Sequence, residues 1–146
     1  MKIKLSNINI LPAFKQSFPS DRKLLKCMTY FAKHKKLDRD IVLDKNNTLV
    51  DGYVAYLTLK SLGIKKCKYV KDENYQWYVQ GKHPGKDKIY TWKLPESLIV
   101  NGLPKIHTGK TCLIRTSIGL DAVRITRVFI SKKSPIDGNI LNFTLA

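Results

Sequence analysis

The clearest alternation of apolar and polar positions lies in the first half of the chain. Residues 41–43 and 48–50 form two short apolar runs rich in β-branched side chains, which is typical of strands. Residues 45–47 read Lys-Asn-Asn, a composition that favours a tight turn. Apolar side chains then recur at helical spacing over residues 54–62. The pattern predicts a β-hairpin followed by a helix.

The corner between the predicted hairpin and helix consists of Asp51, Gly52 and Tyr53. We expect the Asp51 carboxylate to cap the first free N–H groups of the helix. Gly52 lacks a Cβ atom and therefore tolerates a tight turn or a close neighbour. A glycine corner that opens a helix can bind an anion, because free N–H groups and the helix dipole converge there. These three residues are a candidate anion site, and a purely structural turn is the alternative.

An earlier helix is predicted over residues 21–33, with Ser20 as its N-cap directly after Pro19. Five apolar residues at helical spacing are expected to face the core: Leu24, Leu25, Met28, Phe31 and Ala32. Four cations fall outside this stripe: Arg22, Lys23, Lys26 and Lys33. Such a face either contacts phosphate groups or is simply solvated.

The second half shows no helical period. Five segments read as strands, namely residues 76–80, 88–93, 111–116, 122–130 and 140–145. Glycine-containing turns separate them, which is typical of a small antiparallel β-barrel. The glycine-bounded segment 109–119 and the Val/Ile-rich strand after it resemble an SH3-like or OB-like barrel hairpin. The two halves together predict an α+β protein. Because residues 71–74 are polar, we expect the domain boundary there, with domains at 1–71 and 75–146.

The order strand, turn, strand, Val-Asp-Gly, helix and Leu-Gly resembles the core of the ParB/sulfiredoxin-like superfamily over about residues 1–70. The resemblance implies a compact α/β domain in which the start of the helix binds a nucleotide phosphate. Residues 2–5 would then be the opening strand, and residues 67–70 the closing strand.

The corner departs from the pattern of this superfamily. ParB nucleotide-binding members carry a Gly-Glu-Arg-Arg-type run there, and sulfiredoxins carry Gly-Cys-His-Arg, whereas this chain reads Gly52-Tyr53-Val54-Ala55. The phosphate-pairing arginines and the nucleophilic cysteine are both absent from the run. We therefore expect a degenerate member that has kept the fold and binds nucleoside triphosphates weakly or not at all.

The charge balance points to a polyanionic partner. Lys and Arg number 27 against 11 acids, which gives a net charge of +16 over 146 residues. Both halves of the chain contribute to this excess. Repulsion on this scale opposes compactness and is most easily tolerated beside a polyanion. The alternative is a generically lysine-rich protein.

Aromatic and cationic residues interleave in the second half. Val123, Ile125 and Val128 alternate with Arg124 and Arg127, so the arginines should point away from the core. Aromatic residues flanked by cations suit stacking with single-stranded nucleic acid, although one tryptophan and one tyrosine could instead fill the core; the aromatics concerned are Trp77, Tyr78, Tyr90 and Trp92. The candidate nucleic-acid-binding residues are Arg22, Lys23, Lys26, Lys82, Lys88, Trp92, Arg115, Arg124 and Arg127.

Several other kinds of function find little support. Cys27, Cys67 and Cys112 are widely spaced, which argues for reduced cytoplasmic thiols rather than for disulfides or a zinc ribbon. The three histidines are scattered, so we expect no metal site and no cofactor. No apolar run approaches the length of a membrane span. Four acids near the corner could still gather around a divalent ion: Asp38, Asp40, Asp44 and Asp51.

We therefore expect a cytoplasmic, non-enzymatic protein, with no catalytic residues, that binds DNA or RNA. One alternative is a phage or mobile-element inhibitor or adaptor that binds a host nucleoprotein complex. The other is a metal-dependent nuclease or nucleotide hydrolase at the Asp51-Gly52 corner. The sequence leaves the oligomeric state and any sequence specificity open.

Overall fold

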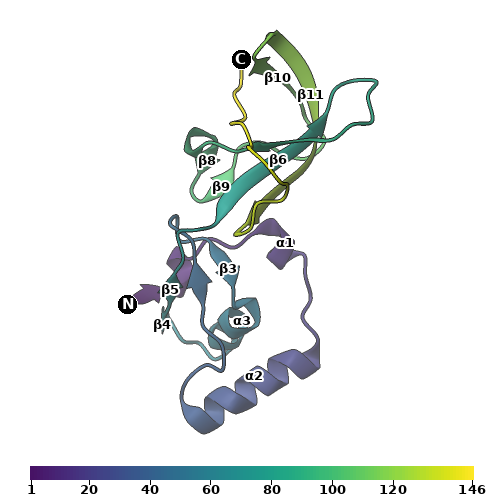
Figure 1. The fold of residues 1–146 in the computed structure, drawn as a ribbon. Helices are drawn as coiled ribbons and strands as arrows, with labels where there is room; N and C mark the ends of the chain where they lie inside the picture. Colours follow the sequence, from purple (N-terminus) through teal and green to yellow (C-terminus); the bar gives the residue numbers. More distant parts are fainter. The chain divides into compact units, whose positions relative to one another are not determined.

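The structure, a computed structural model, describes residues 1–146 and divides into two compact units (Figure 1). The units comprise residues 1–73 and 74–146. Helices and several small sheets combine within one chain, so the predicted α+β class is confirmed. None of the helices is long and apolar enough to cross a membrane.

The N-terminal unit combines two main helices with short strands. β1 pairs with β4 in an antiparallel ladder, and a second sheet has the order β3-β2-β5. In that sheet β2 runs antiparallel to β3 and parallel to β5. The elements are β1 (Lys2–Lys4), α1 (Pro12–Lys15), α2 (Asp21–His34), β2 (Val42–Leu43), β3 (Leu49–Asp51), α3 (Tyr53–Ser61), β4 (Lys66–Lys68) and β5 (Val70–Lys71).

The predicted hairpin is present, and Asp44 closes its turn. Its Oδ1 accepts the backbone N–H groups of Asn46 at 2.8 Å and Thr48 at 2.9 Å. Asp44 and Thr48 are both buried, so these bonds satisfy polar groups that water does not reach. Asp44 therefore has a structural role in the turn.

The expected cap by Asp51 is wrong. The N-cap of α3 is Gly52, whose φ of 93° is left-handed, and no side chain caps the helix. Asp51 Oδ1 instead accepts the N–H of Gly52 at 2.9 Å. The left-handed turn places Asp51 one residue before the cap, and its carboxylate bonds the turn rather than the N–H groups of α3.

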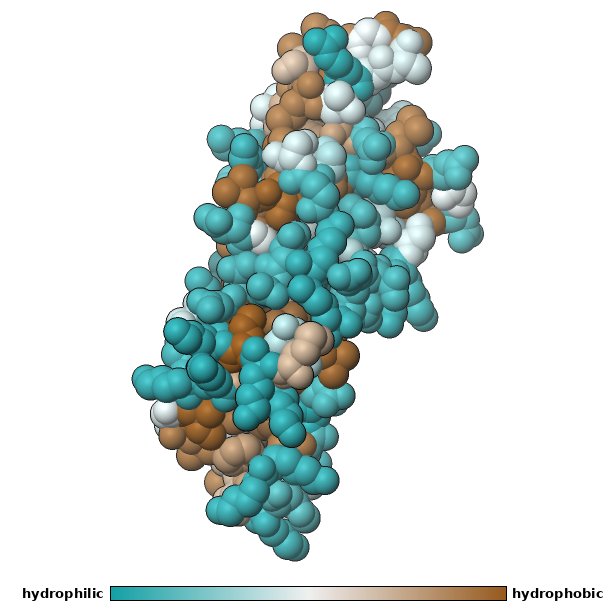
Figure 2. Space-filling model, turned by 90° about the vertical axis from the view of Figure 1, so that its left-hand side faces the viewer, coloured by the Kyte–Doolittle hydropathy of each residue, from teal (hydrophilic) through white to brown (hydrophobic).

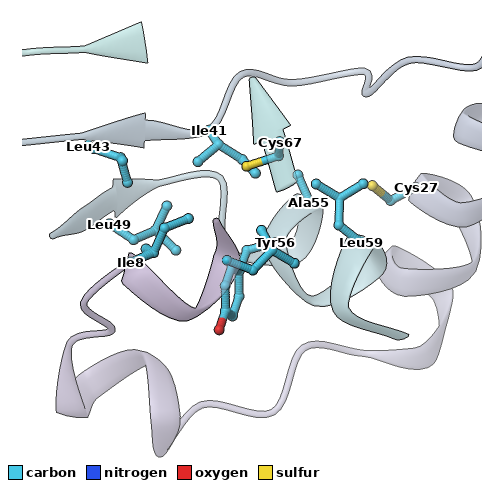
Figure 3. Packing of buried hydrophobic residues seen from close by; sticks show 10 residues of the cluster. Ile8, Cys27, Ile41, Leu43, Leu49, Ala55, Tyr56, Leu59 and Cys67 are labelled. Atoms are coloured by element: carbon cyan, nitrogen blue, oxygen red, sulfur yellow. The ribbon is translucent and has the colours of Figure 1, made fainter. Parts of the chain in front are cut away.

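The core of this unit lies between α3, the hairpin and β4 (Figure 3). Ser20 caps α2 as predicted, accepting the N–H of Lys23 at 3.3 Å. The apolar stripe of α2 is narrower than expected, however: Leu25 is 65% exposed and Ala32 is exposed. Cys27 is the buried residue of this helix, with Leu24, Met28 and Phe31 half-buried beside it. Because α2 packs on α3 along a single side, only residues near Cys27 lose contact with water.

The C-terminal unit is built on a curled four-stranded antiparallel sheet of order β10-β11-β6-β7, a half-barrel. Four of the five predicted strands are present. The fifth, residues 140–145, is not a strand and forms only isolated bridges. A short hairpin of β8 and β9 was not predicted. The elements are β6 (Gln76–Lys82), β7 (Tyr90–Lys93), β8 (Ile99–Val100), β9 (Leu103–Pro104), β10 (Thr111–Thr116) and β11 (Gly119–Ser131).

Residues 141–146 join the two edges of this sheet, which explains why they cannot form a regular strand. On the β7 side, Lys93 donates its N–H to Leu141 at 2.9 Å and accepts the N–H of Phe143 at 2.8 Å. On the β10 side, Arg115 donates its N–H to Thr144 at 2.8 Å. The segment changes partner within two residues, and Phe143 between the two edges is fully buried.

Candidate nucleic-acid interface

The two faces of the four-stranded sheet differ in chemistry. The covered face carries Val79, Val123 and Ile125, which are buried, and Phe143 packs against it. The outer face carries Arg124 and Arg127, both exposed, as the alternation of β11 predicted. The pairing of β11 with β6 shifts between Ile125 and Arg127, and this bulge keeps both arginines on the same face.

The outer face places two cations against each other. Lys82 on β6 lies directly opposite Arg124 on β11. Neither residue forms an ion pair with a carboxylate, and the nearby Asp121 carboxylate pairs instead with His83 at 3.1 Å. Like charges directly opposite each other destabilise a strand pair. The structure thus brings together two of the predicted cations at some cost in stability.

Aromatic rings continue this outer face. The Arg127 guanidinium lies 4.1 Å from the centre of the Phe129 ring, a cation–π geometry. Phe129 stacks on Tyr78 at 5.6 Å, and Lys93 lies directly opposite Tyr78 on β7. Cations and aromatic rings therefore lie next to one another on this face, on three neighbouring strands.

Two further predicted cations belong to the same unit. Arg115 is exposed on β10, directly opposite Leu120 of β11. Lys88 is exposed just before β7, with its Nζ 4.9 Å from the centre of the Tyr90 ring. Tyr90 is 38% exposed and also contacts His83 edge-on at 5.0 Å.

Trp92 lies on the other face. Its strand partner is Val79, and its half-buried ring meets Phe143 edge-on at 5.6 Å. Trp77 and Tyr78 are both buried, but only Trp77 lies on the covered face, whereas Tyr78 is buried on the outer face against Phe129. Among the four aromatics considered from the sequence, Tyr90 is the exposed one beside a cation. Sequence reasoning left it out of the binding set, although its spacing from Lys88 puts both on one side of a strand.

The corner of the N-terminal unit opens onto a pocket of about 660 Å³. Asp51, Gly52 and Tyr53 line it together with Lys23 and Lys26 of α2, so the structure gathers residues that the sequence analysis considered separately. Arg22, by contrast, is exposed and does not line the pocket.

A further cation and a pair of stacked aromatic rings complete this pocket. Arg39, which sequence reasoning missed, also lines it and lies 3.8 Å from the Asp51 carboxylate, with both side chains exposed. The Tyr53 ring stacks on Phe14 at 4.8 Å. The weak binding of nucleoside triphosphates at this corner stays a prediction.

The titratable groups give no sign of a reactive centre. Burial raises the pKa of the thiols of Cys27, Cys67 and Cys112, so these groups are protonated at neutral pH. No three His, Cys, Asp or Glu side chains come together to hold a metal ion.

A second set of cations escaped the sequence analysis. The pairing of β1 with β4 places Lys2 opposite Lys68 and Lys4 opposite Lys66. The signal was present in the sequence, since Lys-Ile-Lys and Lys-Cys-Lys both alternate with a period of two. Only the pairing shows that the two runs are neighbours.

Figure 2 shows hydrophilic residues over much of one side of the surface, with apolar residues gathered in smaller groups between them. The extent of this hydrophilic surface is in keeping with the net charge of +16.

Comparisons with solved structures show a distant likeness to part of this chain. No protein-family model matches the chain, and no curated protein matches it. A solved structure of a Pnob8-like ParB-N domain is similar, with a TM-score of 0.43 and 23% sequence identity. The match covers 50% of this chain and 29% of the other. The chain is thus distantly similar in structure to a ParB-N domain over half its length, and its C-terminal unit is not identified.

Proposed function

We propose that the C-terminal unit binds nucleic acid through the outer face of its four-stranded sheet, without catalysing a reaction. The observation that carries the proposal is the direct opposition of Lys82 and Arg124 with no carboxylate paired to either. Phosphate oxygens of a nucleic acid supply the missing negative charge. Binding would turn a destabilising contact into two charge-assisted ones.

The surroundings of this pair support the proposal. Arg127 extends the positive face along β11, and Lys93 extends it onto β7. Tyr90, beside Lys88 on β7, has a partly exposed ring, but it stacks on Trp92 and therefore lies on the other face of the sheet. The outer face offers cations that can follow a phosphate backbone, with the half-buried Phe129 ring beside Arg127.

The test is a salt titration of binding to fluorescently labelled 20-mers, one duplex and one single-stranded, followed by anisotropy. For wild type, the logarithm of the binding constant should fall linearly with the logarithm of salt, with a slope of about −0.9 per contacted phosphate on duplex. The variant Arg124→Gln/Arg127→Gln should flatten that slope by about one to two units and weaken all sequences alike.

The matched control is Lys105→Gln/Lys133→Gln. It removes the same charge from two exposed positions of the same unit that lie outside the four-stranded sheet. If both double variants change the slope equally, the affinity follows net charge and the outer face is not the binding site.

Absence of binding at about 50 mM salt would overturn the proposal altogether. Capture of a protein partner that survives nuclease treatment and does not respond to salt would favour the adaptor alternative. Comparison of DNA with RNA oligonucleotides of one sequence decides which nucleic acid the protein prefers.

A further inference from the structure

A second surface with opposed cations lies in the N-terminal unit. Lys2 faces Lys68 and Lys4 faces Lys66 across the β1–β4 ladder, and all four are exposed. Ile3 and Cys67, between them, turn toward the core. Two like-charged pairs on a ladder of three residues per strand oppose its formation. A bound anion would relieve that repulsion.

A pocket of about 460 Å³ opens beside this ladder. Its charged lining is lysine alone, with no carboxylate: Lys4, Lys60, Lys65 and Lys66. These residues come from β1, the last turn of α3, the loop after it, and β4. Segments far apart in the sequence therefore converge on one cationic hollow.

Tyr56 supplies a hydrogen-bond donor to the same pocket. The residue is 8% exposed, and its hydroxyl group forms no hydrogen bond within the chain. In Figure 3 the hydroxyl oxygen lies at the end of the ring directed away from Ile41 and Leu43. Burial raises the pKa of the Tyr56 hydroxyl, so it is protonated at neutral pH and available to donate. The hydroxyl oxygen is not among the fully buried side-chain atoms that lack a partner, so it reaches the open pocket and can donate to a ligand there.

The carboxyl end of α3 also lies at this pocket, and three of its last carbonyl groups accept backbone hydrogen bonds. Thr58 accepts the N–H of Leu62 at 3.1 Å, and Lys60 accepts that of Gly63 at 3.1 Å. Leu59 accepts the N–H of Ile64 at 3.0 Å. These bonds reduce the negative potential of the helix end, and the four lysines offset what is left of it.

We propose that this pocket binds a phosphate group, which accepts a hydrogen bond from Tyr56 and is held by the surrounding lysines. Phosphate oxygens are acceptors, and the lysines and the Tyr56 hydroxyl of the pocket offer donors and positive charge. The group is either a phosphodiester of a nucleic-acid backbone or a free phosphate or phosphomonoester. The inference does not depend on the proposed nucleic-acid face, which belongs to the other unit.

The test is a titration of the full ¹⁵N-labelled chain with inorganic phosphate and then pyrophosphate, followed by amide chemical shifts at low salt. We expect saturable shifts at Gly63, Lys65 and Lys66. Tyr56→Phe should weaken binding about tenfold, as loss of a charge-assisted hydrogen bond would. Its melting temperature should stay that of wild type, because the hydroxyl has no partner in the chain.

Tyr69→Phe is the matched control, because Tyr69 does not line the pocket and bonds only the Met1 sulfur. It should bind phosphate as wild type does. Arg124→Gln/Arg127→Gln should also bind phosphate normally, so failure of the outer face and failure of the pocket are separable.

A competition experiment between pyrophosphate and a duplex oligonucleotide identifies the source of the phosphate group. Displacement of pyrophosphate by a duplex oligonucleotide would identify a backbone phosphodiester, whereas simultaneous binding would identify a free phosphate. Both results support the pocket. Shifts that do not saturate, or equal affinity in wild type, Tyr56→Phe and Lys66→Gln, would overturn the proposal.

Discussion

A Cβ atom at Gly52 would lie 2.6 Å from the backbone oxygen of Asp40, so the corner before α3 accepts only glycine. The φ of 93° at Gly52 adds a second constraint, because residues with a side chain rarely adopt it. The closest neighbour is backbone and cannot rotate away. The corner is fixed by packing as well as by conformation.

Gly52→Ala should lower the free energy of unfolding by about 2–4 kcal/mol, from left-handed strain together with the clash. Urea denaturation followed by circular dichroism measures the loss. Gly63→Ala is the control, since its φ is 73° but no atom lies within 4 Å of the added Cβ. That variant should lose only about 1–2 kcal/mol. Equal losses in the two variants would show that the Asp40 contact is unimportant.

Reversing one charge of the opposed pair should separate stability from binding. Lys82→Glu places a carboxylate directly opposite Arg124, and we expect a gain of about 0.5–1 kcal/mol in the free energy of unfolding. The same change should weaken nucleic-acid binding at least tenfold at about 100 mM salt, because it adds repulsion at the outer face. Thermal melting and anisotropy on one preparation test both halves. A variant that binds as tightly as wild type would refute the role of this pair.

The C-terminal segment should contribute strongly to the stability of its unit. Phe143 is fully buried against Trp92 between the two sheet edges, and Phe143→Ala should cost about 3–5 kcal/mol. Leu141→Ala, two residues earlier, removes a side chain that is 74% exposed and should change stability by less than about 0.5 kcal/mol. Tryptophan fluorescence during urea unfolding reports on this unit, which holds both tryptophans. A small loss in the free energy of unfolding for Phe143→Ala would show that this segment does not stabilise the unit by joining its two sheet edges.

The pKa shifts predict how stability depends on pH. Burial raises the pKa of Cys27, Cys67 and Cys112 above 9.0, so the unfolded chain loses these protons first as the pH rises. The free energy of unfolding should therefore be constant near neutral pH and fall above about pH 9. Urea titrations between pH 7 and 10 test this, with the triple Cys→Ala variant as control. A thiol that reacts rapidly with Ellman's reagent at pH 7 in the folded protein would contradict the protonated state.

Much of the fold was readable from local patterns. Ser20 before an amphipathic run predicted the start of α2, and the apolar runs around the Asn-rich turn predicted β2 and β3. The alternation in β11 predicted the exposed positions of Arg124 and Arg127. These features depend on residues a few positions apart, so the sequence contains their full cause.

The wrong predictions concern positions whose role depends on the surrounding fold and not on the local pattern. Asp51 fails as a cap because Gly52 turns left-handed and becomes the cap itself. Leu25 and Ala32 lie outside the core because α2 contacts only one neighbour, which no local pattern reveals. Residues 140–145 have strand composition but bond to two different edges, so they form no ladder.

The sequence alone determined the strong positive charge, most of the helices and strands, and which positions of β11 alternate toward solvent. Tertiary structure decided which charges meet, because strand pairing joins residues that are distant along the chain. It set Lys82 against Arg124 and Lys4 against Lys66, and it turned Trp92 toward Phe143. It also left the Tyr56 hydroxyl without a partner among lysines. Period and capping are local, whereas register and burial depend on the whole chain.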